Sequence, residues 1–445
     1  MTERSPSPTR LLLTAVVAVL AAVVVFAVHD GPVVARRAPQ PTVHDVQRLI
    51  EKYYVREVDP DRLTEAALRG MTEALDPYSS YLSPEEAKAF RDDTEGEFGG
   101  VGIEITIEEG LVRVIAPVEG SPAFEAGVLP GDRIIEIDGV AHEFRSVEQA
   151  AKILKGPPGS RVVLTVVHEG ANEPVELTIE RAIIHVPSVS PPEIVDPARR
   201  IGYVRVAQFS PETGRELREA VATLVRAGAR GLVLDLRSNP GGHLEAALAC
   251  ADLFVADGVL LRTEGRTEHR TRVAHREGTN TDLVLAVLVN GYSASAAEIV
   301  AGALQDAGRA VVVGTRTFGK GSVQQLIPLG PPGHEALLRL TTALWHTRSG
   351  RPIHRPPGAG SDEPWGIRPD VEVELDPARL QRIFRAQAVE RFRHAGAKEP
   401  IVRTAATGDD PQLEAAVRSI RERLDSASAA KSEGGNEATD GEAPR

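Results

Sequence analysis

The sequence predicts a multidomain α/β protein with an inserted β-rich module and helical segments at both ends. Its 445 residues are enough for two or three domains. From about residue 200 onward, apolar runs typical of buried strands alternate with helix-type segments, which indicates a core with parallel strands. Before this core, short β-branched runs alternate with turn residues, and this pattern indicates the separate β-rich module.

Composition restricts the classes of partner and cofactor. The chain is 42% hydrophobic and 26% charged, as expected of a globular protein. Its net charge of −12 and aromatic content of 4% argue against a nucleic-acid partner. Cys250 is the single cysteine, which excludes an internal disulfide and a cysteine-based metal cluster. No histidine pair has the HExxH spacing, so we expect neither a metal nor another cofactor.

The N-terminus carries a membrane or export signal. Leu11 to Val28 contains no charged residue and follows Arg4 and Arg10, a pattern typical of a membrane-spanning helix or a signal-peptide core. Basic residues ahead of the apolar run place the N-terminus in the cytoplasm and the rest of the chain outside. We expect an uncleaved single-pass anchor, and signal cleavage after Val33-Val34-Ala35 is the alternative.

The next segments are amphipathic helices. Val43 to Tyr54 and Leu63 to Leu75 repeat apolar residues at three- and four-residue steps, and Ser83-Pro84-Glu85-Glu86 is a capping box that opens a third helix. These helices are too short to bury their apolar faces alone. We therefore expect them to pack on the rest of the chain or on a second subunit, which would make a homodimer.

The β-rich module begins at Glu97. Its strands surround a Glu109-Gly110 turn, and the segments FGGVGI (98–103) and GSPAFEAGVLPGDRIIEIDG (120–139) are similar to PDZ domains. This resemblance implies that the backbone around Gly100, Val101, Gly102 and Ile103 holds the terminal carboxylate of a peptide, while the peptide adds a strand to the sheet edge. The alternative is that these glycines only turn the chain.

The α/β core contains the segments that carry the candidate catalytic residues. Gly231 to Arg237 is a buried-type strand that ends in Ser238-Asn239-Pro240-Gly241-Gly242, and Asp282 to Val289 is a second such strand. Helix-type sequence follows at Ala294 to Gln305. A third strand, Ala310 to Gly314, leads into the loop Thr315 to Gly321. Helices at Leu380 to Arg393 and Gln412 to Leu424 close the fold, before a polar tail.

These patterns divide the chain into a cytoplasmic n-region (1–10), a transmembrane anchor or signal (11–28), a tether (29–41), an N-terminal helical region (42–96), the β-rich module (97–183), the α/β core (184–375), a C-terminal helical region (376–426) and a disordered tail (427–445).

Ser295 and Lys320 are the candidate nucleophile and base. Ser295 lies at a strand-to-helix corner, where backbone N–H groups without intrahelical partners can hold an oxyanion. Gly319 and Gly321 bracket Lys320 and allow a close approach to another backbone segment. A neutral lysine requires burial to lower its pKa by several units from about 10.4. The alternative is that Ser293 or Ser295 is a plain helix cap and Lys320 a surface charge.

A serine–histidine pair is a second option. Triad partners need not be near in sequence, so spacing alone does not exclude a Ser-His-Asp triad. His243, beside the Gly241-Gly242 turn, is the candidate histidine, although we expect it at the surface or behind the site. Glu298 we interpret as a helix-start carboxylate that interacts with the helix dipole.

Four segments in one order are similar to the carboxyl-terminal processing (tail-specific) serine proteases. They are LDPYSSYL, DLRSNPGG, SASAAEIVAGALQDAGRAVVVG and TFGKGSVQQ, and the likeness covers roughly Val43 to Leu424. The sequence departs from many members at Tyr292 and Ala297, and neither position belongs to the proposed dyad.

This resemblance implies a Ser-Lys dyad in an α/β protease core. Ser295 would attack the scissile carbonyl, Lys320 would take and return the proton, and Gln324 would orient the lysine by accepting a hydrogen bond. Backbone amides of Ala296 and Gly241 would form the oxyanion hole.

The substrates would be C-terminal tails of proteins, bound by the PDZ domain and cleaved outside the cytoplasm in the periplasm of a bacterial cell envelope. The competing hypotheses are a catalytically silent, membrane-tethered PDZ scaffold and a Ser-Lys amidase.

Overall fold

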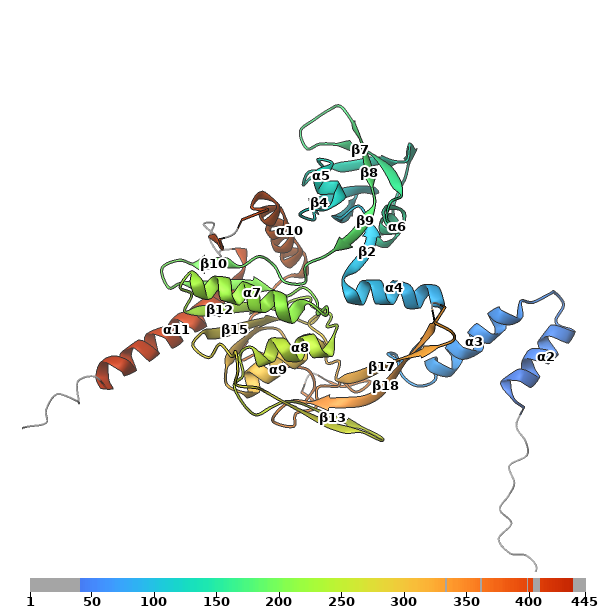
Figure 1. Cartoon of the computed structure of the whole chain (residues 1–445). Coiled ribbons are helices and arrows are strands. Elements are labelled where there is room, and N and C mark those ends of the chain that lie inside the picture. The colour runs from blue at the N-terminus through green and yellow to red at the C-terminus, as the bar shows by residue number, and fades with distance from the viewer. Residues whose placement is uncertain (1–40, 333, 361, 398, 403–408, 435–445) are drawn as a thin grey trace, which may run out of the picture. The chain divides into compact units, whose positions relative to one another are not determined.

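The computed structural model describes residues 41–332, 334–360, 362–397, 399–402 and 409–434 (Figure 1). The predicted n-region, the predicted anchor or signal Leu11–Val28 and nearly all of the predicted tether lie outside the described residues. Within these ranges, no helix has the length and apolar character needed to cross a membrane. The chain divides into two units, Met1–Met71 and Thr72–Arg445.

The described part of the first unit is helical. In α2 (Val43–Tyr53), Thr42 and Asp45 form a capping box, because the Thr42 hydroxyl accepts from the Asp45 N–H at 3.1 Å and the Asp45 carboxylate accepts from the Thr42 N–H at 3.0 Å. α3 (Pro60–Glu73) follows. Both helices occupy the predicted amphipathic segments. Four apolar side chains of α2 are exposed, namely Val43, Val46, Leu49 and Tyr53.

The second unit starts with the segment that contains LDPYSSYL. β1 (Ser80–Leu82) pairs with β18 (Ala336–His346), and α4 (Pro84–Glu95) follows. The predicted capping box at the start of α4 is confirmed. The Ser83 N–H donates to the Glu86 carboxylate at 2.9 Å, and the Glu86 N–H donates to the Ser83 hydroxyl at 3.3 Å.

The β-rich module has its own sheet and core. β2 (Glu97–Gly100) and β9 (Ala182–His185) pair where the chain enters and leaves it. The sheet order is β3-β4-β5-β7-β8, so β3 (Ile103–Glu108) lies at the sheet edge. The remaining elements are β4 (Leu111–Pro117), α5 (Pro122–Glu125), β5 (Arg133–Ile137), β6 (Val140–Ala141), α6 (Val147–Leu154), β7 (Arg161–Val167) and β8 (Val175–Glu180).

The core sheet confirms the α/β prediction. Its described strands have the order β19-β16-β15-β12-β11-β10-β20, and the pairs from β19 to β11 are parallel. Among the described strands of this sheet, only the β11–β10 pair is antiparallel. These strands are β10 (Glu193–Asp196), β11 (Ile201–Arg205), β12 (Gly231–Asp235), β15 (Val284–Val289), β16 (Ala310–Gly314), β19 (Val371–Glu372) and β20 (Ile401–Val402).

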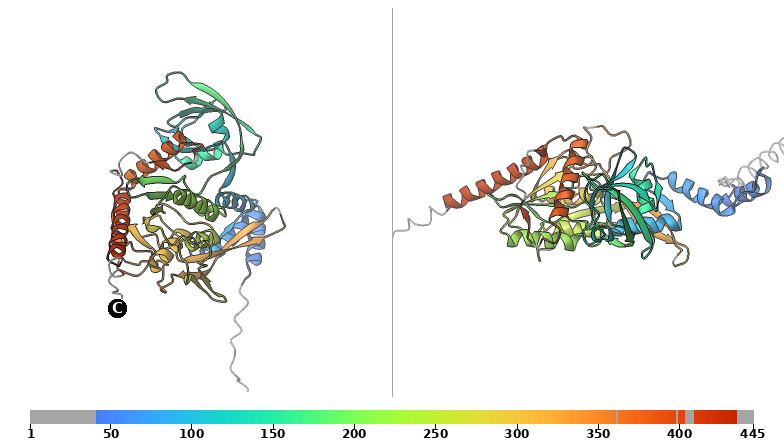
Figure 2. Two further views of the ribbon diagram at one scale, coloured as in Figure 1. Left: turned by 60° about the vertical axis from the view of Figure 1, so that its left-hand side comes forward. Right: turned by 90° about the horizontal axis from the view of Figure 1, so that it is seen from above.

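Helices cover both faces of this sheet (Figures 1 and 2). One face packs against α7 (Thr213–Arg226), α8 (Leu244–Asp252) and α9 (Ala296–Asp306), and this layer includes Cys250, buried as predicted. The opposite face packs against α11 (Pro411–Gly434), drawn in red. Because both faces are covered, the central strands β15 and β16 are continuous apolar runs without alternation.

α11 is longer than predicted. The sequence predicts a helix that ends at Leu424 and disorder from residue 427, whereas α11 continues to Gly434. The disordered tail is therefore corrected for its first residues. Alanine, lysine and glutamate favour helix even where the sequence has no apolar face, so the helix continues beyond its apolar pattern.

A second sheet carries the remaining site residues. β17 (Ser322–Leu329) and β18 form an antiparallel pair, and β13 (Val259–Gly265), β14 (His269–Val273) and β1 complete the sheet. α10 (Pro377–Arg393) lies between β19 and β20 in the chain. The loops after β12, β15 and β16 leave the carboxyl ends of adjacent parallel strands, where open α/β sheets usually place their ligands.

Candidate active site

One cavity of about 500 Å³ collects the residues predicted for catalysis. Gly241, Ser295, Ala296, Lys320 and Gln324 all line it. They come from the loop after β12, the start of α9, the loop after β16 and strand β17. Phe209, Ile299 and Trp345 supply apolar parts of its wall. Segments distant in the sequence therefore meet at one cavity.

Ser295 occupies an unusual backbone conformation. Its φ is 54° and its ψ is −114°, a region that favours glycine. A non-glycine residue held there stores strain of about 1–3 kcal/mol, and such strain often marks functional sites. The residue immediately precedes α9, so its side chain sits where the first helical N–H groups have no intrahelical partners.

Ser293 is distinguished from Ser295 by its surroundings. The Ser293 side chain is 0% exposed, and its hydroxyl donates to the Leu236 carbonyl at 2.7 Å and accepts from the Asn290 N–H at 2.9 Å. Ser293 does not belong to the cavity lining, whereas Ser295 does. The Ser293 hydroxyl thus has a structural role in joining two loops. The sequence alone does not distinguish Ser293 from Ser295 in this way.

Glu298 holds the two halves of the site together. Its carboxylate is 0% exposed and accepts four hydrogen bonds. Oε1 accepts from the Thr317 hydroxyl at 2.6 Å and the Gly319 N–H at 2.7 Å. Oε2 accepts from the N–H groups of Ser295 and Lys320, both at 2.8 Å. A single oxygen therefore bridges the backbones of the candidate nucleophile and the candidate base.

This role of Glu298 is larger than the helix-dipole interaction that the sequence predicts. The Ser-x-x-Glu spacing is a capping-box signal and indicates the bond to the Ser295 N–H. Nothing in that local pattern indicates the three donors from the loop at 317–320. Burial raises the pKa of Glu298, while the hydrogen bonds from Thr317, Gly319, Lys320 and Ser295 oppose this change. Because every partner donates, the site is shaped for the ionised carboxylate.

Lys320 lies in surroundings that favour its neutral form. Its side chain is half-buried, and burial is the main cause of a lowered pKa, to which the nearby charge of Arg339 adds. Glu298 acts in the opposite direction by favouring the ammonium. The net direction is the one that a lysine base requires, since only the neutral amine can accept a proton.

Gln324 belongs to a network that reaches the LDPYSSYL segment. Its Nε2 donates to the Ser322 hydroxyl at 2.8 Å and to the Thr341 hydroxyl at 3.2 Å, and the Thr341 hydroxyl donates to Asp76 Oδ1 at 3.2 Å. The described residues show no hydrogen bond between Gln324 and Lys320, so the predicted contact is not made in this structure.

The network nevertheless fixes the orientation of the Gln324 amide. Burial alone would raise the pKa of Asp76, but hydrogen bonds from Ser79, Tyr78 and Thr341 lower it, so Asp76 is an acceptor only. Thr341 must then donate to Asp76 and accept from the Gln324 NH₂ group. This arrangement leaves Gln324 Oε1 available to a donor such as the Lys320 ammonium.

The two backbone N–H groups predicted to hold the oxyanion differ in their hydrogen bonds. Ala296 N–H donates to no described residue, as expected at the first position of a helix. Gly241 N–H instead donates to Asn239 Oδ1 at 2.9 Å. Gly241 has φ 103°, and a Cβ added there would lie only 2.7 Å from Ser295 Cβ. Any other residue at this position would therefore clash with Ser295.

The other option from the sequence, a histidine base, has less support. His243 lines the same cavity, but it is exposed at the start of α8. No hydrogen bond between the imidazole and Ser295 occurs among the described residues.

The loop predicted to bind a carboxylate directly precedes the edge strand β3, which begins at Ile103. Val101 is buried, Gly102 has φ 79°, and neither backbone N–H donates to a described residue. Gly100 pairs with Ala182, and Ile103 begins β3. The free edge of β3 and helix α6, which packs beside it, border the place where an added peptide strand would lie.

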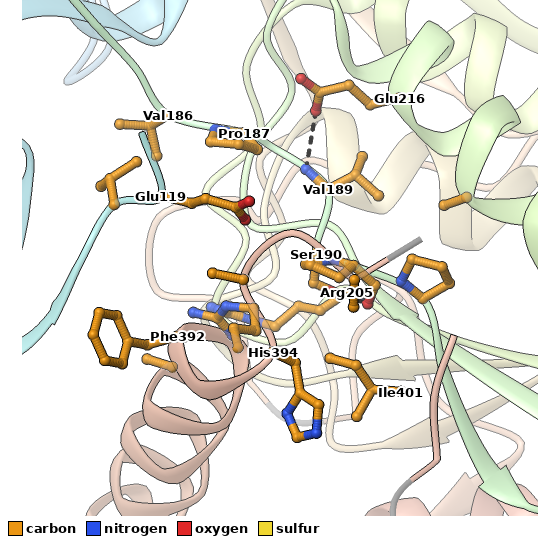
Figure 3. Close-up of a pocket in the computed structure, with 18 of the residues that line it drawn as sticks. Glu119, Val186, Pro187, Val189, Ser190, Arg205, Glu216, Phe392, His394 and Ile401 are labelled. Carbon is orange, nitrogen blue, oxygen red and sulfur yellow. Dashed lines mark hydrogen bonds between the residues drawn. The ribbon is translucent and has the colours of Figure 1, made fainter. Parts of the chain in front are cut away.

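A second cavity of about 630 Å³ lies away from this chemistry (Figure 3). It is lined by the connector after β9, by α7 and by the end of α10, and it contains none of the predicted catalytic residues. Figure 3 shows Glu216 of α7 bound to this connector, where its carboxylate accepts from the Val189 N–H at 3.1 Å. The same carboxylate accepts from the Ser188 hydroxyl at 2.6 Å. Glu216 therefore anchors the connector on α7.

Comparisons with known proteins agree with this architecture. Residues 200–373 match peptidase family S41, residues 113–168 match a PDZ domain, and residues 35–86 match the N-terminal domain of activating protease CtpB. The carboxy-terminal-processing protease of Bartonella bacilliformis is 42% identical over 336 residues, which cover 74% of each chain. The carboxy-terminal processing protease CtpA of Bacillus subtilis is 32% identical over 379 residues, 83% of this chain and 78% of that protein.

A solved structure assigned to the S41 proteases, from Bacteroides fragilis, covers 87% of this chain and 99% of its own with a TM-score of 0.52 and 19% identity, which supports the fold. The chain therefore belongs to peptidase family S41, among the carboxy-terminal processing proteases, and is a serine-type peptidase with a PDZ domain.

Proposed function

We propose that this protein is a Ser-Lys endopeptidase that binds C-terminal tails of proteins through its PDZ domain and cleaves them. The observation that carries the proposal is the shared Glu298 oxygen, which accepts from the backbone N–H groups of both Ser295 and Lys320 at 2.8 Å. A buried carboxylate that spans both loops keeps the nucleophile and the base at one cavity.

The proposed reaction follows the chemistry of these side chains. Ser295 Oγ attacks the scissile carbonyl carbon, and the neutral Lys320 amine accepts the hydroxyl proton. The oxyanion is held by the N–H of Ala296, together with the N–H of Gly241 once it leaves Asn239. Lys320 then gives its proton to the leaving amine, and the C–N bond breaks to leave an acyl-serine. Lys320 next deprotonates the water that hydrolyses this ester, and the proton returns to Ser295. Gln324 Oε1 accepts a hydrogen bond from the ammonium while Lys320 is charged.

Tail recognition rests on the free N–H groups at the start of β3. The amides of Val101 and Gly102, with the neighbouring Gly100 and Ile103, would bind the terminal carboxylate, and the tail would pair with the open edge of β3. This proposal predicts that amidation of a substrate's C-terminus slows its cleavage. An unchanged rate after amidation would contradict it.

Location and assembly are separate proposals. The apolar run Leu11–Val28 would anchor the chain with its catalytic part outside the cytoplasm, or would be cleaved after export. The exposed apolar side chains of α2 would pack against a second copy to make a homodimer. Protease accessibility in intact cells and the mass of the purified protein in solution test these two points.

The dyad is tested with the full-length protein and an unstructured protein substrate. We expect Ser295→Ala and Lys320→Ala to reduce cleavage by at least a thousandfold while both variants still bind a tail peptide. A silent PDZ scaffold would instead show the same slow background for wild type and variants. An amidase would hydrolyse small amides but leave the unstructured protein intact.

The pH dependence of the wild type is the sharper measurement. Only neutral Lys320 is active, so kcat/KM should rise with pH through the lysine pKa. Because burial lowers that pKa, the midpoint should lie below the ordinary lysine value of 10.5. A midpoint at or above 10.5 would contradict the assignment of the base.

A further inference from the structure

The segment LDPYSSYL precedes the catalytic core by more than a hundred residues, yet its loop Asp76–Ser79 reaches the active site. The loop is internally fixed. Asp76 Oδ1 accepts from the N–H groups of Tyr78 at 2.8 Å and Ser79 at 2.9 Å, and Oδ2 accepts from the Ser79 hydroxyl at 2.7 Å. The Asp76 side chain thus closes a turn whose tip is Tyr78.

This turn is also fixed to strand β18. The Thr341 N–H donates to the Ser79 hydroxyl at 3.1 Å, and the Thr341 hydroxyl donates to Asp76 Oδ1 at 3.2 Å. Ser79 is only 5% exposed. The position of Tyr78 is therefore set by contacts to the same strand that holds the Gln324 network.

Tyr78 lies against the amine of Lys320. The Lys320 Nζ atom is 5.3 Å from the centre of the Tyr78 ring, and the His354 ring meets Tyr78 edge-on at 6.1 Å. The Tyr78 ring is itself partly buried, and its face is turned toward the Lys320 amine. A ring at this distance displaces water from the amine and contacts the ammonium through its π face.

Two charged side chains from different elements act on the Lys320 amine. Arg339 of β18 disfavours the ammonium, and Glu298 of α9 favours it. The Asp76 carboxylate and the His354 ring, from the segment after β18, are neighbours of Tyr78. Because the charges of Arg339 and Glu298 act in opposite directions, exclusion of water is the main means of keeping the amine neutral, and the Tyr78 ring contributes to it.

We propose that Tyr78 is a positioning residue for the general base, because its ring covers Lys320 and keeps water from the amine. This inference rests on the proposed Ser-Lys mechanism and concerns a residue outside the dyad and its oxyanion hole. The ring matters in this role, and the hydroxyl does not.

The experiment compares pH profiles of kcat/KM for the full-length wild type, Tyr78→Ala and Tyr78→Phe. Water admitted beside the amine should move the ascending limb of Tyr78→Ala up by about one pH unit, which lowers kcat/KM about tenfold near neutral pH. The loss should shrink as the pH rises, and KM should change less than kcat. Tyr78→Phe should retain the wild-type midpoint.

The midpoint is independent of how much enzyme folds, because a loss of folded protein lowers the whole profile without displacing it. Tyr81→Ala is the matched control. Tyr81 is the second tyrosine of LDPYSSYL and pairs with Leu338 of β18, and its substitution should keep the wild-type midpoint. An unshifted midpoint in Tyr78→Ala, or an equal shift in Tyr78→Phe, would overturn the inference. If Lys320→Ala retained activity, the proposed mechanism itself would fail, so the two failures are distinguishable.

Discussion

The tail-binding loop of the PDZ domain and the catalytic cavity are built in opposite ways. The proposed tail-binding loop is one continuous stretch, 98–103, and its proposed role depends on the backbone N–H groups of Val101 and Gly102, which donate to no described residue. The cavity is assembled from the start of α9, the loops after β12 and β16, and strand β17. A contiguous site depends on local backbone shape, whereas an assembled site depends on the side chains that join its parts.

The largest effect should come from Glu298, which joins the assembled site. Glu298→Gln replaces an acceptor of four hydrogen bonds with a group that carries two donors, so buried N–H groups of the two loops lose their partner. We expect kcat/KM to fall at least a thousandfold and the free energy of unfolding to fall by about 2–4 kcal/mol. Steady-state kinetics and denaturant unfolding measure these quantities.

Glu245→Gln is the matched control for Glu298→Gln. Glu245 lines the same cavity but is exposed and pairs with Arg272 at the surface. Its substitution should change stability by less than about 1 kcal/mol. Equal losses in both variants would show that any charge removed from this cavity has the same effect, and the bridging role of Glu298 would be untenable.

A smaller effect, confined to tailed substrates, should follow from changing the contiguous site. Gly102 has φ 79°, and a Cβ there would lie 2.3 Å from Ser121 Cβ. Gly102→Ala should therefore displace the carboxylate loop and raise KM for a tailed protein about tenfold, while cleavage of a short peptide that does not reach the PDZ domain stays unchanged. Gly120→Ala, with φ 70° and nothing within 4 Å of its added Cβ, is the control for backbone strain alone. If both substitutions raised KM equally, the loop geometry would not be the cause.

The sequence predicts features that depend on local pattern, but not the contacts that join distant segments. Helices and strands with regular apolar periods, the PDZ strands and the α/β alternation follow from local pattern. Local pattern also made Ser295 and Lys320 candidates, and the resemblance specified their roles and added Gln324. The partners that join these residues do not follow, because Glu298, Thr341 and Asp76 act across long separations in the chain. By contrast, the bond from the Gly241 N–H to Asn239 is a local Asx turn, whereas no local pattern indicates that Ser293 is buried.

The Thr341 hydroxyl should have a moderate effect on the chemical step. Thr341→Val keeps the shape of the side chain but removes the donor to Asp76 and the acceptor for Gln324, so the Gln324 amide is free to rotate. One hydrogen bond is worth about 1 kcal/mol, which corresponds to a fivefold to tenfold fall in kcat. Thr341→Ser retains the hydroxyl and should lose less than threefold. Single-turnover rates measure the step directly, and equal rates for the valine and serine variants would contradict the orienting role.

The smallest effect concerns the strain at Ser295 itself. With φ 54° and ψ −114°, this position favours glycine, so Ser295→Gly should be more stable than Ser295→Ala although both are inactive. The relieved strain is about 1–3 kcal/mol, and the greater freedom of glycine in the unfolded chain offsets about 0.4–1 kcal/mol of it, which leaves about 1 kcal/mol in favour of glycine. At Ser419, inside α11, the order should reverse, since glycine is about 1 kcal/mol less favourable than alanine in a helix. Denaturant unfolding of the four variants measures both differences. If alanine were the more stable residue at both positions, the Ser295 conformation would cost the protein nothing, and the strained nucleophile turn would lose its physical basis.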